Sequence, residues 1–466
     1  MKESRRLIKN TGIIAVGNMS TRIVSFLLLP IYTAILTTSE YGTIDYIISI
    51  ALFCVPFISL LMDESMFRFL IDCKTEEDKA KIISLSIVII LLGCGGFFLI
   101  AIPILIVIKY VYSVQLVLYI CSSVLSLMIS ALLRGIGRTD QYAVFNFFAS
   151  ALNASLNVVF IAIFHWGIKG MLSAFIIAQF LSSIIFIVKQ KLWRYINFGA
   201  LDKRKAKEMI KYSIPLIPNK VSWSFINMLG RIIIINIIGS IAAGIYAIAY
   251  KFPTLMDTVY GFFYQSWRES SARVMNDDDK KEFYDSVYKY LKSFMYSLVV
   301  GMVAFMPMVF SILVNETYYE ALSYIPILLL AMYFSNMSGF YGGIFTAYRD
   351  TKIMGVTTIV GATVNIVLSF GMIYFWGIYA VTIGTLIANI VVYSYRKRKL
   401  KRYVVLVEDR KRQIRAICVT AIVFILFYME KQNYTVVACI IAIIYAIFEN
   451  RELLKQGYLR MKGRKA

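Results

Sequence analysis

The stretch TGIIAVGNMSTRIVSFLLLPIYTAIL, residues 11–36, is apolar over most of its length and carries one charge, Arg22. About 20 apolar residues suffice for a helix to cross the hydrocarbon core of a bilayer. The stretch IPLIPNKVSWSFINMLGRIIIINIIG, residues 214–239, places Arg231 in a matching context, with an asparagine four positions earlier in both cases. A cation near the bilayer centre costs roughly 3 kcal/mol on insertion scales. The pair therefore predicts a duplicated membrane protein that handles an anion.

Composition supports a membrane-embedded chain. Of the 466 residues, 59% are hydrophobic and 16% are charged, whereas soluble domains have about 45–50% and 25%. The apolar runs are continuous rather than alternating, which favours helices over strands as the spanning elements. We predict an all-α polytopic protein with fourteen transmembrane helices. Their expected ranges are 11–36, 43–66, 81–108, 114–133, 141–164, 169–188, 213–238, 241–265, 290–314, 321–346, 352–375, 377–395, 414–430 and 434–449.

The basic residues predict the orientation of these helices. If the N-terminus is cytoplasmic, 42 of the 49 lysines and arginines lie in cytoplasmic segments, and only Lys109, Lys169 and Lys431 lie in external loops. This asymmetry follows the positive-inside rule and predicts that both termini are cytoplasmic. The net charge of +22 could also indicate nucleic-acid binding, but the cations alternate with membrane spans instead of clustering on one soluble module. They are placed to meet anionic lipid headgroups.

An internal repeat predicts the domain organisation. The segment HWGIKGMLSAFIIAQ, residues 165–179, aligns with FWGIYAVTIGTLIAN, residues 375–389, at nearly the offset that separates the two arginines. An even number of helices separates the equivalents, so both halves have the same orientation. We expect a six-helix lobe over 1–200, a second over 201–402, and two extra helices with a basic tail over 403–466. Such lobes suit alternating access, although duplication also serves simply to build a large bundle.

A polar stripe marks the first helix of each predicted lobe. Lys220, Ser224, Asn227 and Arg231 recur at helical spacing, and Asn18 and Arg22 occupy matching positions in the first lobe. Lys251 adds a cation in the following span. Because arginine can grip a phosphate at two points and lysine adds charge, this set favours a multivalent anion. The alternative is that the arginines bond to neighbouring helices or extend to the interface.

Acidic residues near the membrane are candidates for ion coupling. They are Asp45, Asp63, Glu64 and Asp257. Sodium ions or protons are the expected coupling ions, although a local ion-pair cluster would explain Asp63 and Glu64 equally well. No Walker sequence is present, so ATP is not expected to drive the chain directly. No cofactor, metal site or catalytic residue is predicted, because no histidine, cysteine or carboxylate cluster has ligand spacing.

The chain resembles the Wzx-type polysaccharide flippases, in the polysaccharide-transporter branch of the multidrug/oligosaccharidyl-lipid/polysaccharide superfamily. The resemblance rests on RIVSFLLLPIYTAILTTSEYG (22–42), LRGIGRTDQY (133–142), LNASLNVVF (152–160) and AAGIYAIAYKFPTL (242–255). It implies a MATE-like fold of two six-helix lobes. It also implies transfer of an undecaprenyl-diphosphate-linked oligosaccharide, destined for O-antigen, capsule or exopolysaccharide, to the outer leaflet of a bacterial cytoplasmic membrane.

The resemblance also implies roles for residues and partners. Arg22 and Arg231, with Lys220 and Lys251, would bind the diphosphate. Asn18, Ser224 and Asn227 would support them in the cavity. Polymerase and chain-length proteins of the same pathway would be partners. One departure is FFYQSWRES (262–270), where related proteins often have a proline after the tryptophan, so a helix bend is not assured there.

Three other functions compete with this reading. A peptidoglycan-precursor (lipid II) flippase has the closest requirements, and the sequence separates it poorly. A multidrug exporter of the same superfamily would favour acids in its cavity rather than cations. A membrane glycan polymerase would display acids or arginines in a large external loop, and the predicted external loops are short. The chain is therefore expected to be a transporter rather than an enzyme.

Overall fold

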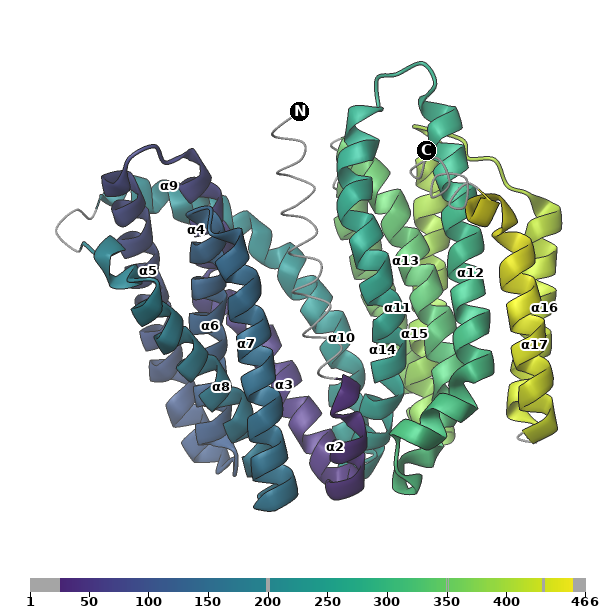
Figure 1. The fold of residues 1–466 in the computed structure, drawn as a ribbon, viewed down its shortest axis with the longest axis horizontal. Helices are drawn as coiled ribbons and strands as arrows, with labels where there is room; N and C mark the ends of the chain where they lie inside the picture. The colour runs from purple at the N-terminus through teal and green to yellow at the C-terminus, as the bar shows by residue number, and fades with distance from the viewer. Residues whose placement is uncertain (1–25, 198–201, 349, 351, 430–431, 456–466) are drawn as a thin grey trace, which may run out of the picture. The chain divides into compact units, whose positions relative to one another are not determined.

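The computed structural model of the chain describes residues 26–197, 202–348, 350, 352–429 and 432–455, and for 106, 218–219 and 222–227 only the backbone (Figure 1). Within these ranges the chain forms helices and connecting turns without a β-strand, which confirms the all-α prediction. The chain divides into two compact units, Met1–Ile235 and Asn236–Ala466. We call them the first and the second unit.

The first unit is built around a central helix. Its described elements are α2 (Leu29–Ile35), α3 (Thr38–Ser59), α4 (Met62–Asp72), α5 (Glu76–Ile108), α6 (Ser113–Gly135), α7 (Thr139–Asn157), the π-helix η1 (Val158–Ile163), α8 (Gly167–Lys189), the 3₁₀ turn η2 (Leu192–Tyr195), α9 (Lys203–Ser213), the 3₁₀ turn η4 (Ile214–Leu216) and α10 (Ile217–Ile237), which belongs to this unit as far as Ile235. Helix α6 packs against α3, α4, α7 and α8. Its inward residues, such as Leu133, are fully buried.

The predicted span 43–66 is two helices rather than one. α3 ends at Ser59 and α4 begins at Met62, and between them Leu60 and Leu61 take left-handed backbone angles, with φ of 48° and 50°. Such angles are uncommon for residues other than glycine. The Ser59 hydroxyl accepts a hydrogen bond from the Leu61 amide, which compensates one donor freed by the break. The break leaves Asp63 and Glu64 in the first turn of a new helix.

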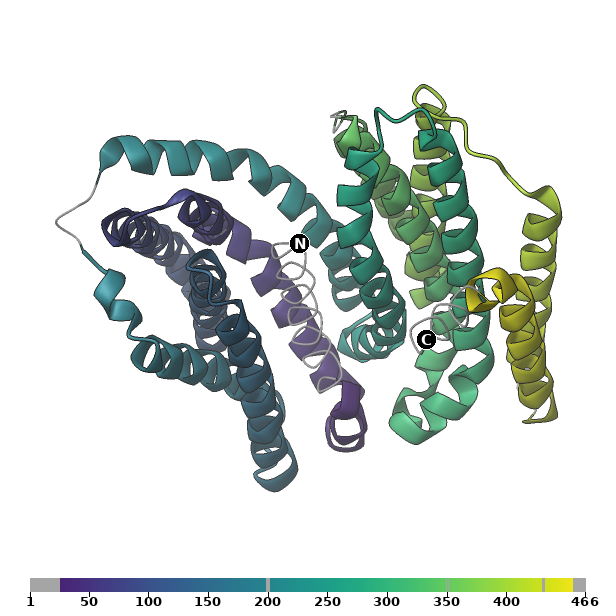
Figure 2. The ribbon, with the colours of Figure 1, turned by 45° about the horizontal axis from the view of Figure 1, so that its top comes forward.

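The second unit contains the longest helices of the described chain. Its elements are α11 (Ser240–Arg273), α12 (Lys280–Leu313), the 3₁₀ segment η5 (Glu316–Tyr324), α13 (Ile325–Ala347), α14 (Lys352–Trp376), α15 (Ile378–Leu400), α16 (Arg410–Tyr428) and α17 (Gln432–Glu449). α13 packs against α11, α12 and α15, and most of its residues are buried. The last two helices, α16 and α17, pack against α12 and each other (Figure 2).

Ten described helices are long and apolar enough to cross a membrane. This confirms a multi-pass membrane protein, while the count of fourteen is not confirmed. Most of the first predicted span, 11–36, lies outside the described residues. In α10 the apolar part is a shorter segment, Met228–Ile237. Helices α11 and α16 are not among the ten, because charged residues interrupt or flank their apolar stretches.

The repeated Trp-Gly-Ile sequence carries a glycine with the same φ in both units. Gly167 and Gly377 each have a φ of 53°; Gly167 is the first residue of α8, and Gly377 directly precedes α15. Only glycine takes this region without steric cost, because a Cβ would clash with the backbone. The pattern that predicted the duplication therefore marks a glycine of positive φ at the start of a helix in both units.

The missing proline after Trp267 leaves α11 unbroken. The helix continues six residues past Trp267, to Arg273. The indole is 2% exposed, stacks on Phe340 at 4.3 Å between ring centroids, and donates from Nε1 to the Phe340 carbonyl at 2.9 Å. The helix therefore does not end at this position, and the tryptophan joins α11 to α13.

Candidate functional site

Arg231 of α10 forms an ion pair with Asp45 of α3, in which its Nε donates to Asp45 Oδ2. The side chains are 14% and 19% exposed, so the pair is largely removed from solvent. Tyr41, one helical turn before Asp45, is buried and lies within electrostatic range of both charges. α3 is fixed at its start by a reciprocal cap, in which Thr37 and Glu40 satisfy each other's backbone amides. This cap positions Asp45 two turns into the helix.

A second group of charges lies near the other end of α10. Lys220 is exposed, and its charge interacts with that of Asp63 in α4. Asp63 and Glu64 occupy the first turn of α4, where the positive end of the helix dipole favours carboxylates. One oxygen of Asp63, Oδ1, is buried and accepts no hydrogen bond from the described residues. Lys220 and Arg231 are eleven residues apart, or about 16 Å along the helix axis.

These contacts join residues to which the sequence assigned separate roles. Arg231 and Lys220 were predicted to bind an anion, and Asp45, Asp63 and Glu64 to couple an ion. In the structure each cation of α10 interacts with an acid of the broken α3–α4 helix. Arg231 therefore has an acidic partner on a neighbouring helix. An anion that binds Arg231 must share it with Asp45 or displace Asp45.

The other predicted residues are distributed as follows. Lys251 is half-buried and Asp257 is exposed, and both lie on α11 of the second unit. Their six-residue separation places them about 120° apart around the helix axis, so they do not share a face. Arg22 and Asn18 lie outside the described residues, as do the side chains of Ser224 and Asn227, whose backbone belongs to α10.

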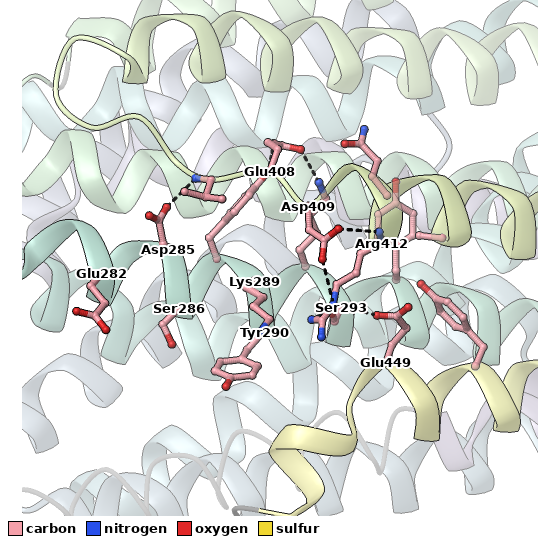
Figure 3. A pocket seen from close by; sticks show the side chains of 17 residues that line it. Glu282, Asp285, Ser286, Lys289, Tyr290, Ser293, Glu408, Asp409, Arg412 and Glu449 are labelled. Carbon is pink, nitrogen blue, oxygen red and sulfur yellow. Dashed lines mark hydrogen bonds and ion pairs between the residues drawn. The ribbon is translucent and has the colours of Figure 1, made fainter.

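A polar network that the sequence did not predict lies where α16 and α17 meet α12 (Figure 3). Glu408 pairs with Lys292 at 2.9 Å and with Lys397 at 2.7 Å, and accepts a hydrogen bond from the Tyr288 hydroxyl at 2.8 Å. Further ion pairs involve the last residue of α17 and the segment after it, and they are Arg412–Glu449, Arg415–Glu449, Lys289–Glu452 and Arg412–Glu452. The runs of charge were visible in the sequence, but nothing in them showed that these helices are neighbours.

Glu408 provides a test of this network. Burial opposes the ionisation of its carboxyl, but hydrogen bonds and charge from Lys397, Lys292 and Tyr288 outweigh burial and lower its pKa from 4.5 to about 2. The carboxylate therefore stabilises the fold fully above pH 4.5, and this contribution, about 3 kcal/mol, is lost as the pH falls toward 2. Melting curves of the protein and of Glu408→Gln between pH 6 and 3 should converge toward low pH. Curves that stay parallel would contradict the assigned contacts.

The helical fold, with ten described helices able to cross a membrane, defines a polytopic α-helical membrane protein. A structure described as the lipid II flippase MurJ in an inward closed conformation is similar, with a TM-score of 0.69 and 15% sequence identity, over 94% of this chain and 99% of that one. An inward-facing multidrug resistance MATE family transporter of the MOP superfamily is similar with a TM-score of 0.64 and 14% sequence identity, over 82% of this chain and 98% of that one. A Vibrio cholerae MATE transporter is similar with a TM-score of 0.55 and 15% sequence identity, over 85% of this chain and 97% of that one. At these identities the likeness establishes the fold.

Sequence comparison establishes the family. The model for polysaccharide biosynthesis proteins matches residues 7–267, which is more than half of the chain. The chain belongs to this family, which confirms the resemblance drawn from its motifs. No curated protein sequence matches the chain.

Proposed function

We propose that this protein moves an undecaprenyl-diphosphate-linked oligosaccharide from the inner to the outer leaflet of a bacterial cytoplasmic membrane by alternating access. Membership in the polysaccharide biosynthesis family and a fold shared with lipid and drug transporters support this function. The observation that carries the proposal is Arg231, a cation held largely out of solvent in α10 beside an acid. A lipid-linked diphosphate is an anion that a membrane-embedded arginine can bind at two points.

The Asp45–Arg231 pair suggests how binding and release are controlled. Asp45 neutralises Arg231 when no substrate is bound, so that α10 does not hold an unpaired charge. The diphosphate then competes with Asp45 for the guanidinium. Protonation of Asp45, or a sodium ion bound to it, would free Arg231 for the substrate and so couple transport to an ion gradient. Lys220, Lys251 and Arg22 are proposed to add positive charge along the path, with Asn18, Ser224 and Asn227 as supporting donors.

Deletion of the gene tests the substrate. Cells without the protein are expected to accumulate an undecaprenyl-diphosphate oligosaccharide in the inner leaflet, and mass spectrometry of extracted lipids would identify its sugars. Expression of the protein from a plasmid should remove the accumulated lipid. Accumulation of the peptidoglycan precursor instead would assign the chain to lipid II transport. An unchanged lipid-linked glycan pool with altered drug sensitivity would favour a multidrug exporter.

A further inference from the structure

A cavity of about 360 Å³ lies in the second unit between the first half of α12, the segment before α16, and the facing ends of α16 and α17 (Figure 3). Its wall includes carboxylates, basic side chains and tyrosines, among them Asp285, Arg412 and Tyr445. This volume is within the range of small-molecule sites. The cavity is formed by residues of one unit alone, and none of the residues proposed for transport lines it.

The cavity lies at the polar boundary of three helices. α12 is about 51 Å long at 1.5 Å per residue, and its last charged residue is Lys292, after which Ser293 to Leu313 carry no charge. α16 likewise has no charge after Arg415, and α17 has none before Glu449. Lys292, Ser293 and Glu449 all line the cavity. It is therefore at the depth where hydrocarbon gives way to headgroups, on the side that the basic residues predict to be cytoplasmic.

The charges that α12 contributes to the cavity follow a fixed order toward the membrane. The helix begins with Lys280 and Lys281, which do not line the cavity. Among the lining residues Glu282 and Asp285 come first, and no ion pair joins either of them to a described lysine or arginine. Lys289 follows about 6 Å further along the axis, and Tyr296 lies beyond the last charge. On the α12 wall, negative charge therefore lies farthest from the membrane, positive charge nearer to it, and Tyr296 at the hydrocarbon level. The carboxylates of Glu408, Asp409 and Glu449 line other parts of the cavity. An anion alone would meet the acids unfavourably, whereas a headgroup with both charges would fit.

Arg412 supplies a second and independent indication of a ligand. Its side chain is 17% exposed, yet its side-chain contacts with described residues are long: Ser293 at 3.5 Å, Glu452 at 3.4 Å, and Glu449 and Asp409 at 3.6 Å each. Charge-assisted hydrogen bonds of arginine are ordinarily about 2.7–2.9 Å. A largely buried guanidinium that makes no short bond in the described chain has donors suited to a phosphate in the adjoining cavity.

We propose that this cavity binds the headgroup of a zwitterionic phospholipid that carries a primary ammonium group. The ammonium group lies between Glu282 and Asp285, and the phosphate accepts hydrogen bonds from Arg412 and Lys289. The glycerol end faces Tyr296 and Tyr445, where the acyl chains enter the hydrocarbon. A bound lipid would thus hold α16 and α17 against α12. This site is separate from the transport site and does not depend on the proposed substrate.

Native mass spectrometry of the full-length protein tests the proposal. Phosphatidylethanolamine, phosphatidylcholine and phosphatidylglycerol with identical acyl chains would be added to the detergent-solubilised protein. We expect phosphatidylethanolamine to bind at least about tenfold more tightly than the other two, because only its ammonium donates hydrogen bonds to the paired acids. Equal binding of the three lipids, or a preference for phosphatidylglycerol, would overturn the proposal.

Two variants and a matched control assign the preference to the cavity. E282Q/D285N should lose the preference for phosphatidylethanolamine while still binding phospholipids. R412Q should weaken the binding of all three lipids. D278N removes an exposed acid in the turn just before α12 and outside the cavity, and should retain the preference. Because Glu282 is exposed and Asp285 half-buried, the double variant is expected to fold even if R412Q does not. A preference that survives in E282Q/D285N would also overturn the assignment.

Discussion

Replacement of Arg231 by alanine is expected to reduce glycan transport by at least about 30-fold, because truncating one member of a buried charge pair costs roughly 2–5 kcal/mol. The variant also leaves Asp45 without its partner in a site that is 19% exposed, so part of the effect will be loss of stability. Transport assays must therefore be paired with measurements of membrane insertion and melting temperature. Arg231→Lys keeps the positive charge but cannot donate two parallel hydrogen bonds to the diphosphate. Its transport rate is expected to lie between those of the wild type and Arg231→Ala.

The double variant Asp45→Asn with Arg231→Ala separates structure from function. It removes both charges, so the stability lost in Arg231→Ala should be largely regained. Transport should remain lost, because no guanidinium is present to bind the diphosphate. Asp45→Asn alone leaves Arg231 charged and should retain substrate binding while losing its dependence on the ion gradient. Full transport by the double variant would contradict a substrate role for Arg231.

Trp267→Ala is expected to destabilise the second unit by about 4 kcal/mol, since buried large-to-small changes of aromatic residues cost roughly 3–5 kcal/mol. The indole is 2% exposed and fits against Gly343, where a Cβ would come within 2.5 Å of the ring. Trp376→Ala is a matched control, because that indole is 52% exposed, and it should change the melting temperature little. Equal effects of the two substitutions would contradict the described packing.

The same contact predicts a reciprocal effect at Gly343. Gly343→Ala should destabilise the protein because the new methyl group overlaps the Trp267 ring. Combining it with Trp267→Phe, which shortens the ring system, should recover part of that loss. Additive losses in the double variant would indicate that the two residues do not share this contact.

Periodicity and hydropathy predicted much of the fold but not its details. The repeated Trp-Gly-Ile sequence was found by aligning the two halves of the chain, and in the structure its glycine has a positive φ at both positions. Hydropathy placed the start of α12 near residue 290, whereas the helix begins at Lys280, since hydropathy detects the hydrocarbon and not the helix that continues beyond it. The break at Leu60 and Leu61 contains neither glycine nor proline and gave no signal.

The candidate site was likewise predicted in part from the sequence. Helical spacing predicted that Lys220 and Arg231 lie along one helix, because the period of the α-helix determines this directly. It could not predict that Asp45 pairs with Arg231, because these residues are 186 positions apart and only tertiary packing brings α3 to α10. The same reason explains why Glu408 and Lys292 were not recognised as partners. Spacing within one helix selects a face, but it does not select the neighbour of that face.

Reconstitution of the purified protein into liposomes tests the central claim most directly. A fluorescent polyprenyl-diphosphate oligosaccharide would be placed in both leaflets, and a membrane-impermeant quencher would report how fast the inner pool becomes accessible. We predict that wild-type protein accelerates this exchange over protein-free liposomes, and that an inserted and folded Asp45→Asn/Arg231→Ala variant does not. Exchange at the protein-free rate with wild-type protein under an imposed sodium or proton gradient would contradict a flippase function.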